Sequence, residues 1–406
     1  MDEACARIPK TPTFLLSALL AVSLMISGSV PAAAIDCERD PADYQGETRR
    51  AAPSDMWRDA RLLPIDGELP EPLQGALNDS MDRILTKVSG ASIAVAIPGE
   101  GQWFSQRGRL TADRQQAPEG ALFQAASVTK PFVAAVAYQL VAENKLSLQQ
   151  RVDRWFPSVP LSSAMTIEQL LYHTHGLVSF NALPDFPDRY QTPSQLVALA
   201  ASKPLLFCPG AYFAYSNTGY AMLGQVIEQL EGKPLHQVIA DRITDPMRLE
   251  HTVLRHRGDQ VSIVDGFQSG QPVTVKDGYA TPYAAGGLAS NAADLVRFWH
   301  GYLSGKVVSV EAVKTQFNNL ARLDQHGQQF YGGGVQYYDI PGDGPGRMLG
   351  HSGGIHGFTS VVAYIPGDNL FIAVLFNDQN VAAEAGLWGL LRAIRDYRAA
   401  TKADQH

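Results

Sequence analysis

Residues 125–131 read Ala-Ala-Ser-Val-Thr-Lys-Pro, and they lead directly into the apolar run from Phe132 to Ala142. A helix over this run would be apolar on nearly all sides, which is typical of a helix buried in a core. Proline is tolerated only near the start of a helix, where its missing N–H has no partner to lose. Pro131 therefore predicts that the helix begins close to Ser127. The fold is expected to be built around this buried helix.

Ser127 and Lys130 are three residues apart, so their side chains share one face of the helix start and can meet. A serine hydroxyl is a weak nucleophile until a base accepts its proton, and a lysine amine can be that base when burial lowers its pKa. The helix start also favours developing negative charge, with the Ser127 N–H expected to donate. A bare Ser-x-x-Lys pattern arises by chance roughly once or twice in a chain of this length, but few chance matches would open a buried helix.

The composition indicates a globular protein with a large core. The chain has 406 residues, of which 45% are hydrophobic and 18% are charged. Size alone suggests two or three domains. The formal net charge is -7 and no basic run occurs, which argues against nucleic acid or an anionic membrane surface as a partner.

The N-terminus has the pattern of a secretory signal peptide over residues 1–34. Arg7 and Lys10 precede an apolar stretch from Phe14 to Ile26, and small residues follow up to Ala34, where we expect cleavage. A membrane anchor is the alternative, but the apolar stretch is short for a bilayer span. The predicted protein is periplasmic or secreted, with no membrane span after cleavage.

Two cysteines would remain after this cleavage, Cys37 and Cys208, because Cys5 lies in the predicted signal. They could form a disulfide in an oxidising compartment or stay unpaired. Their positions in the sequence do not choose between these outcomes.

Hydrophobic periodicity and turn residues predict the other elements. They are an extended surface arm over residues 35–70, a helix over 71–88, strands at 92–97, 102–109, 332–340, 348–352, 360–365 and 370–376, and a closing helix over 383–398. Since strands lie toward both ends and helices in the middle, we predict an α+β fold: an antiparallel sheet flanked by terminal helices, with a mainly helical lobe inserted at about 123–285. The domain would span 71–398, with its site between the lobes.

Capping residues predict several helix starts in the middle of the chain. Thr166 with Gln169, and Thr192 with Gln195, have the spacing of capping boxes. Ser290 is expected to cap the helix that follows it.

Tyr215-Ser216-Asn217 lies in a loop just before a predicted helix. A phenol near a lysine can move protons, because a neighbouring cation favours its ionised form. Asn217 offers a donor and an acceptor to a substrate amide. The alternative is a buried tyrosine with a satisfied hydroxyl, followed by an asparagine that caps the helix.

Residues 350–357 read Gly-His-Ser-Gly-Gly-Ile-His-Gly at the end of a predicted strand. Consecutive glycines such as Gly353 and Gly354 let a backbone approach a ligand closely. The N–H of Gly354 could be a second oxyanion donor beside that of Ser127, while His351 and Ser352 could orient a substrate. The alternative is a glycine-rich hairpin without a ligand.

Other motifs are interpreted as structural. His173 and His175 have a spacing that could hold a metal, but no His-Glu-x-x-His pattern or cysteine pair accompanies them, so we favour a loop that turns at Gly176. The glycine runs at 99–101 and 332–334 lack the context of phosphate loops and are taken as turn and strand features. Neither a metal nor a cofactor is predicted.

Taken in order, Ser-Val-Thr-Lys at 127–130, Tyr-Ser-Asn at 215–217 and His-Ser-Gly at 351–353 resemble the three motifs of the penicillin-recognising serine hydrolases. The resemblance is to the branch with class C β-lactamases, D-Ala-D-Ala carboxypeptidases, D-aminopeptidases and family VIII carboxylesterases. Residues 171–177 and 285–290 resemble further stretches of that branch. The resemblance covers roughly residues 75–395 and implies a β-lactamase/DD-peptidase-like fold.

The resemblance also implies acyl transfer without a cofactor. Ser127 would attack a carbonyl and form an acyl-enzyme, with Lys130 and Tyr215 sharing the roles of base and acid. Asn217 would hold the acyl side chain, and His351, Ser352 and Gly353 would bind substrate. The N–H groups of Ser127 and Gly354 would stabilise the oxyanion, and water would release the acyl group.

Two departures from the family pattern concern the substrate. His351 stands where true β-lactamases carry a lysine, and a neutral imidazole binds a carboxylate less well. The preceding strand carries Gln336 and no arginine. We predict an exported hydrolase of D-amino-acid peptides, amides or β-lactams, with peptidoglycan stem peptides among the candidate substrates. The alternatives are a family VIII-type carboxylesterase and a non-catalytic β-lactam or cell-wall sensor.

Overall fold

The structure is a computed structural model that describes residues 50–403 except 58, 114–119, 188, 275–278 and 343. The predicted signal peptide and Cys37 lie outside the described residues, so cleavage and disulfide pairing stay predictions. Among the described residues, no helix combines the length and the hydropathy that a membrane crossing requires.

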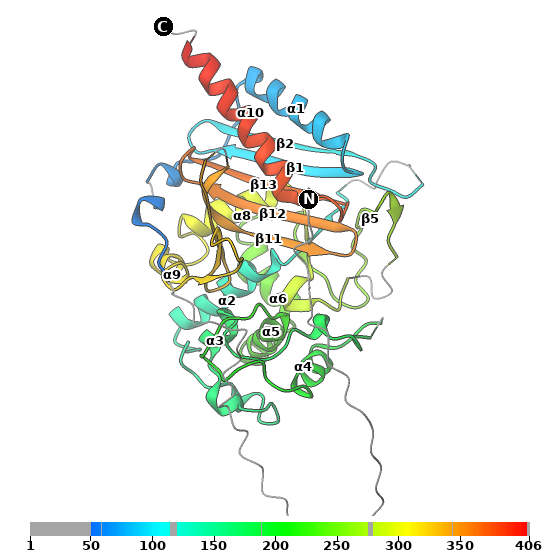
Figure 1. Cartoon of the computed structure of the whole chain (residues 1–406), viewed down its shortest axis with the longest axis vertical. Helices are drawn as coiled ribbons and strands as arrows, with labels where there is room; N and C mark the ends of the chain where they lie inside the picture. The colour runs from blue at the N-terminus through cyan, green and yellow to red at the C-terminus, as the bar shows by residue number, and fades with distance from the viewer. Residues whose placement is uncertain are drawn as a thin grey trace, which may run out of the picture. The chain divides into compact units, whose positions relative to one another are not determined.

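The central element is an eight-stranded antiparallel sheet (Figure 1). Its strands, from one edge to the other, are β2 (Gly101–Gly108), β1 (Gly90–Ile97), β13 (Leu370–Phe376), β12 (Phe358–Ile365), β11 (Gly346–Ile355), β10 (Gln336–Ile340), β9 (Gln329–Tyr331) and β8 (Ala321–Arg322). Every residue of β13 is buried, since helices cover both faces of the sheet. A strand buried on both faces carries a continuous apolar run instead of an alternating one.

The two terminal helices flank the sheet, as predicted. The helices α1 (Glu71–Leu85) and α10 (Ala383–Ala403) lie side by side over one face (Figure 1). The helix α8 (Ala292–Leu303) packs against β1, β12 and β13. Trp299 of α8 is fully buried and donates its indole N–H to the Leu349 carbonyl at 2.9 Å.

The chain between β3 (Phe123–Ala126) and β7 (Leu288–Ser290) is mainly helical, which agrees with the predicted fold class. Its α-helices are α2 (Thr129–Ala142), α3 (Ile167–Leu171), α4 (Pro193–Ala201), α5 (Asn217–Glu231), α6 (Leu235–Ile239) and α7 (Tyr283–Gly286), and its short strands are β4 (Val253–Leu254), β5 (Phe267–Gln268) and β6 (Gln271–Pro272). A second sheet with the order β3-β7-β4 lies where this helical part leaves and rejoins the larger sheet.

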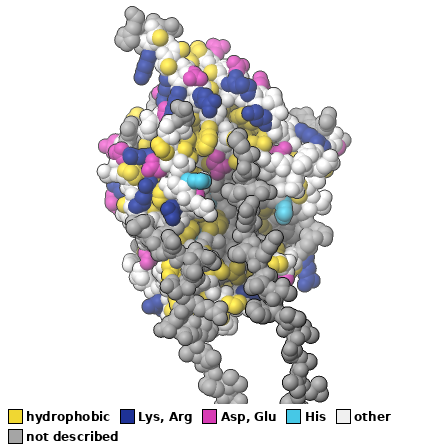
Figure 2. Space-filling view, in the orientation of Figure 1, with side chains coloured by type: hydrophobic (Ala, Val, Ile, Leu, Met, Phe, Trp, Pro, Cys, Tyr) yellow, Lys and Arg dark blue, Asp and Glu magenta, His cyan; other side chains and the backbone are white. Residues whose placement is uncertain are grey.

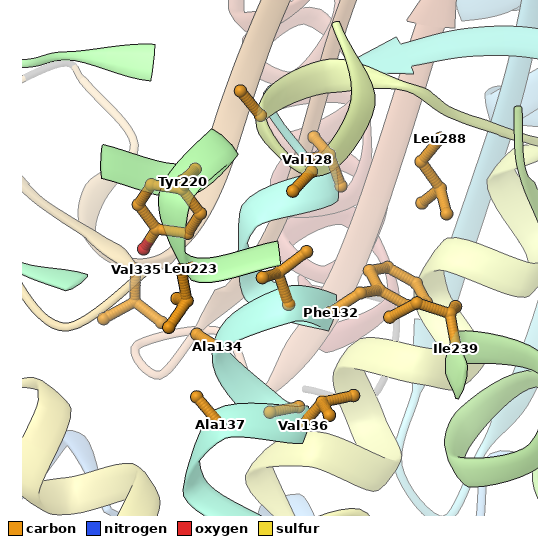
Figure 3. Close-up of a cluster of buried hydrophobic side chains, with 14 of the residues drawn as sticks. Val128, Phe132, Ala134, Val136, Ala137, Tyr220, Leu223, Ile239, Leu288 and Val335 are labelled. Carbon is orange, nitrogen blue, oxygen red and sulfur yellow. The ribbon is translucent and has the colours of Figure 1, made fainter. Parts of the chain in front are cut away.

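Helix α2 is buried on nearly all sides, as its apolar sequence predicts. Figure 3 shows its labelled side chains projecting from different sides of the helix, with Ala134 near Leu223 and Val335. Phe132 is fully buried and stacks on Phe298, with 3.6 Å between the ring centroids. The start of α2 is thus held by contacts in several directions, which positions the residues just before it.

Two predicted capping boxes are confirmed, at Thr166 and Thr192. The predicted cap at Ser290 is wrong, because Asn291 accepts the bond from the Asp294 N–H at 2.9 Å. Ser290 is the last residue of β7, and its hydroxyl bonds elsewhere.

The strand predicted over 332–340 is also wrong in its first part. Residues 332–334 form the turn between β9 and β10, where the Gly332 N–H donates to the Val335 carbonyl at 2.9 Å. A side chain at Gly332 would place its Cβ 1.9 Å from the Gln316 carbonyl oxygen, and Gly334 has a φ of +91°. The close approach at Gly332 and the left-handed backbone at Gly334 therefore explain why glycine occupies these two positions.

The arm predicted as extended over 35–70 is described from Arg50 onward and is not extended throughout. It contains two short 3-10 helices, at Ser54–Met56 and Asp59–Leu62. Its two described ends lie at opposite edges of the large sheet, with Arg50 paired to Leu320 beside β8 and Glu68 paired to Gln102 of β2. The segment thus pairs with β2 at one edge of the sheet and with the residue before β8 at the other.

Charged side chains on the surface form local ion pairs. Arg242 lies between Glu143 and Glu231, with N–O distances of 2.7 and 2.8 Å. On the face drawn in Figure 2, Lys and Arg side chains are interspersed with Asp and Glu. Exposed pairs contribute about 0–1 kcal/mol each, so the buried apolar contacts account for most of the stability.

Phe132→Ala is expected to lower the free energy of unfolding by about 3–5 kcal/mol, because the variant leaves a cavity beside Phe298. Phe104 of β2 is 44% exposed, so the matched change Phe104→Ala is expected to cost less than about 1 kcal/mol. Chemical denaturation of both variants measures the difference. Equal costs would contradict the assignment of α2 to the core.

Candidate active site

A sharp turn joins β3 to α2 and carries Ser127. Ala126 has a φ of +48°, which is unusual for a residue other than glycine and turns the chain away from the strand. Thr129 holds the turn, because its hydroxyl donates to the Ala126 carbonyl at 2.6 Å and accepts from the Leu288 N–H at 2.9 Å. Helix α2 begins at Thr129, so Ser127 lies just before the helix, close to the predicted position.

Lys130 is fully buried and contacts Ser127 directly. Its Nζ lies 3.1 Å from Ser127 Oγ, 2.8 Å from Asn217 Oδ1 and 2.7 Å from the Ala285 carbonyl oxygen. Burial lowers the pKa of Lys130 well below its usual value, which favours the neutral amine. A neutral amine has two N–H groups and one lone pair. The amide and carbonyl oxygens can accept the N–H groups, leaving the lone pair for the Ser127 hydroxyl proton.

Asn217 is held with its oxygen toward Lys130. Its Nδ2 donates to Asn181 Oδ1 at 2.8 Å, and its backbone N–H donates to Ser179 Oγ at 2.9 Å. The Ser179 hydroxyl in turn donates to Asn181 Oδ1 at 2.7 Å. Helix α5 begins at Asn217 and its N-cap is Ser216, so the alternative of Asn217 as the capping residue is wrong.

Tyr215 lies against both Ser127 and Lys130. Lys130 Nζ is 4.8 Å from the centroid of the Tyr215 ring. Burial raises the pKa of Tyr215 above its usual value, and the hydrogen bond with the Ser127 side chain opposes that shift only in part. The expectation that a cation favours the phenolate is therefore wrong, because desolvation dominates. Tyr215 is a protonated phenol near neutral pH, which can donate a proton to a departing group.

Strand β11 passes directly behind Ser127 at Gly353. A Cβ at Gly353 would lie 2.7 Å from the Ala125 carbonyl oxygen and 2.8 Å from the Ser127 nitrogen. A Cβ at Gly354 would have no neighbour within 4 Å, and Gly354 lines the cavity in front of Ser127. Ser360 fixes the approach of the strands, since its hydroxyl donates to the Ala125 carbonyl at 2.7 Å. The pairing of the Ser127 and Gly354 N–H groups as oxyanion donors stays a prediction.

His351 and Ser352 have other partners than a substrate. Burial is the main cause that lowers the pKa of the fully buried His351 to about 3, so the ring is neutral. Its Nδ1 donates to the Ser352 carbonyl at 2.6 Å, and its Nε2 lies 3.3 Å from the Tyr331 hydroxyl. The N–H and hydroxyl of Ser352 both donate to Gln336 Oε1, at 2.7 and 3.2 Å. Neither residue lines the cavity, so the geometry gives no support to their predicted role in substrate binding.

The cavity beside Ser127 has a volume of about 470 Å³. It is lined by Ala126, Ser127, Phe180, Asn181, Phe186, Pro187, Arg189, Asn217, Tyr279, Thr281, Pro282, Ala285, Gly286, Gly354, Ile355 and His356. Phe180 and Phe186 stack with 5.7 Å between their ring centroids and form an apolar wall. Of the described lining residues, Arg189 is the only Lys, Arg, Asp or Glu. Such a cavity suits an apolar group next to a carbonyl.

The described residues contain no group of three or more His, Cys, Asp or Glu side chains that could hold a metal ion. The two histidines considered for this role each accept a backbone hydrogen bond. His173 Nδ1 accepts from the Ser216 N–H at 3.1 Å, and His175 Nδ1 accepts from the Leu177 N–H at 3.0 Å.

Several groups that form the site have no clear signal in the sequence. The Ala285 carbonyl has no side-chain signal, because any residue supplies a backbone oxygen. Asn181 lies in the short 3-10 helix Phe180–Ala182 and Arg189 in the chain after it, and only the fold brings both to the cavity. Thr129 belongs to the Ser-Val-Thr-Lys motif at 127–130. Threonine hydroxyls often bond to nearby backbone groups at turns, so the residue type was a signal for the role that the structure shows.

A family model described as "Beta-lactamase" matches residues 77–395 of the chain. The chain belongs to the beta-lactamase family. The "Beta-lactamase" of Escherichia coli K12 is 23% identical over 362 residues, which cover 79% of this chain and 94% of that relative. "Esterase EstB" of Burkholderia gladioli is 29% identical over 242 residues, or 53% of this chain and 60% of EstB. "Protein Rv1367c" of Mycobacterium tuberculosis is 29% identical over 241 residues, and the match spans only 59% of its length.

Comparison with solved structures agrees with the family. The D-amino acid amidase of Ochrobactrum anthropi SV3 superposes with a TM-score of 0.72 at 23% identity, covering 81% of this chain and 100% of the amidase. At this identity the likeness concerns the fold. The predicted β-lactamase/DD-peptidase-like fold is confirmed, and the relatives of this member of the beta-lactamase family include proteins named as a beta-lactamase and an esterase.

The rate of acylation is expected to fall as the pH is lowered through the reduced pKa of Lys130, because a protonated amine cannot accept the Ser127 proton. Activity near pH 7 is expected, where an unperturbed lysine with a pKa of about 10.4 would be charged. Lys130→Ala is expected to lower acylation at least about a hundredfold. Lys130→Arg keeps a charge that does not titrate and serves as the control. If the Lys130→Ala variant loses activity at low pH in the same way as wild type, the assignment of Lys130 as the base is contradicted.

Gly353→Ala is expected to lower acylation more than about a hundredfold, because the added methyl group would displace the Ser127 N–H. Gly354→Ala is the matched control, since its methyl group would enter open space in the cavity and keep the N–H in place. Burst kinetics with an ester substrate and melting temperatures of both variants separate local displacement from unfolding. Near-normal acylation in Gly353→Ala would count against the close approach of β11.

Proposed function

We propose that this chain hydrolyses amide or ester bonds through an acyl-enzyme on Ser127. Lys130 takes the proton of the Ser127 hydroxyl as its oxygen attacks the carbonyl carbon. Tyr215 delivers a proton to the leaving group as the bond to that group breaks. The N–H groups of Ser127 and Gly354 stabilise the oxyanion, and a water molecule then releases the acyl group by the reverse proton movements.

The observation that carries this proposal is the environment of the Lys130 amine. It is fully buried, it has two oxygen acceptors that are not charged, and its third neighbour at 3.1 Å is Ser127 Oγ. A buried ammonium without a carboxylate partner would carry the free-energy cost of an unpaired buried charge. The amine avoids this cost only if it stays unprotonated. The arrangement therefore matches a base that activates a serine.

We propose substrates with a D-amino-acid acyl group and an apolar side chain, in the form of amides, peptides or β-lactams. The stacked rings of Phe180 and Phe186 form a wall for such a side chain, and Asn181 and Asn217 offer amide groups beside it. The fold likeness to a D-amino acid amidase agrees with this substrate class. Peptidoglycan stem peptides, met after export to the periplasm or beyond, are the proposed natural source.

A carboxylesterase is the second candidate. His351 is neutral and buried, and Gln336 is engaged with Ser352, so neither provides a cation for the carboxylate of a peptide or β-lactam. An ester without a carboxylate needs no such cation. The relative named Esterase EstB agrees with this candidate.

A substrate panel on wild type and Ser127→Ala tests the proposal. We expect turnover of D-phenylalanine amide or a short-chain nitrophenyl ester by wild type, a loss of at least about a thousandfold in Ser127→Ala, and a mass increase on Ser127 with a fluorescent penicillin. Turnover of the amide with no preference for the ester favours the amidase. Turnover of the ester alone favours the esterase. An adduct that is not released within hours would favour the sensor. Full activity in Ser127→Ala would overturn the acyl-enzyme.

A further inference from the structure

The loop after α3 holds the segment that leads to Tyr215. Three backbone hydrogen bonds join the loop to this segment. The Leu206 N–H donates to the Gly176 carbonyl, the Gly210 N–H to the Thr174 carbonyl and the Ala214 N–H to the His173 carbonyl, at 2.8, 2.7 and 3.0 Å. The last of these bonds fixes the residue directly before Tyr215.

The His173 side chain fixes the residue directly after Tyr215. Its Nδ1 accepts from the Ser216 N–H at 3.1 Å, and its ring centroid lies 4.4 Å from that of Tyr215. The ring is fully buried, and His173 has a φ of +55°. A left-handed conformation at a residue other than glycine persists only where the surroundings hold it. His173 therefore binds the chain on both sides of Tyr215 and packs against its ring.

The charge state of His173 suits this contact. Burial is the main cause that lowers the pKa of His173 well below its usual value, so the ring is neutral. Because Nδ1 accepts a hydrogen bond, the proton of the neutral ring is on Nε2. Nε2 has no hydrogen-bond partner among the described residues, and the ring centroids of His173 and Tyr331 lie 4.5 Å apart with the ring planes at 60°. A neutral ring adds no charge beside the Lys130 amine.

We propose that His173 is a positioning residue that places the Tyr215 hydroxyl on Ser127 and on the leaving group. This inference rests on the proposed acyl transfer. When the Ser127 oxygen bonds to the carbonyl carbon and the bond to an amide nitrogen breaks, that nitrogen needs a proton, and Tyr215 supplies it. A nitrophenolate leaves without a proton. Asn217 has separate anchors in Ser179 and Asn181, so the effect of His173 passes through Tyr215.

The test compares an amide and a nitrophenyl ester of the same acyl group. His173→Leu removes the acceptor and the ring, and it is expected to lower kcat/KM for the amide by about a hundredfold but for the ester by less than about tenfold. His173→Asn places an oxygen near the position of Nδ1 and is expected to restore most of the amide activity. His173→Phe keeps a ring without an acceptor and provides the same comparison if the leucine variant does not fold.

His175 provides the matched control. It is equally buried and its Nδ1 also accepts a backbone bond, but that bond comes from Leu177. His175→Leu is expected to lower the melting temperature while keeping the wild-type ratio of amide to ester activity. In a Tyr215→Phe background, His173→Leu is expected to change this ratio no further.

Three results would overturn the role of His173. They are equal losses for amide and ester in His173→Leu, the same ratio change in His175→Leu, and additive effects of His173→Leu and Tyr215→Phe. A failure of the proposed function looks different, because Ser127→Ala would then keep its activity. The two proposals can therefore fail separately.

Discussion

The site depends on the burial of one amine. Transfer of a charged ammonium out of water is costly, so the fold favours the neutral form of Lys130 and offers it oxygen atoms without charge. These oxygens come from Asn217 and Ala285, which lie far apart in the chain. The lone pair that remains faces Ser127. Reactivity and stability are thus coupled, since the contacts that desolvate the amine also close the core.

The surrounding elements give this amine a rigid frame. Helix α2 is buried on nearly all sides, and the turn before it is held by Thr129 between the Ala126 carbonyl and the Leu288 N–H. Strand β11 can lie against Ser127 only because Gly353 lacks a side chain. A small sheet, a buried helix and the large sheet therefore meet at one serine.

Neutral groups dominate the neighbourhood of the serine. His351 and His173 are both uncharged because burial disfavours their protonated rings. The His-Ser-Gly motif at 351–353 thus contributes backbone and packing to the site. The cavity wall in front of Ser127 is largely apolar. Arg189 is the only Lys, Arg, Asp or Glu among the described lining residues. Recognition of a substrate is therefore expected to rest on shape and amide hydrogen bonds more than on charge pairs.

Local patterns in the sequence determined the buried helix after Pro131, the capping boxes at Thr166 and Thr192, and the pairing of Ser127 with Lys130, because each depends on residues within one or two helical turns. Other features depend on contacts between distant segments. Only the tertiary structure buried His351, brought the Ala285 carbonyl to the amine and raised the pKa of Tyr215. Burial and backbone carbonyls leave no side-chain pattern, so the sequence alone could not reveal them.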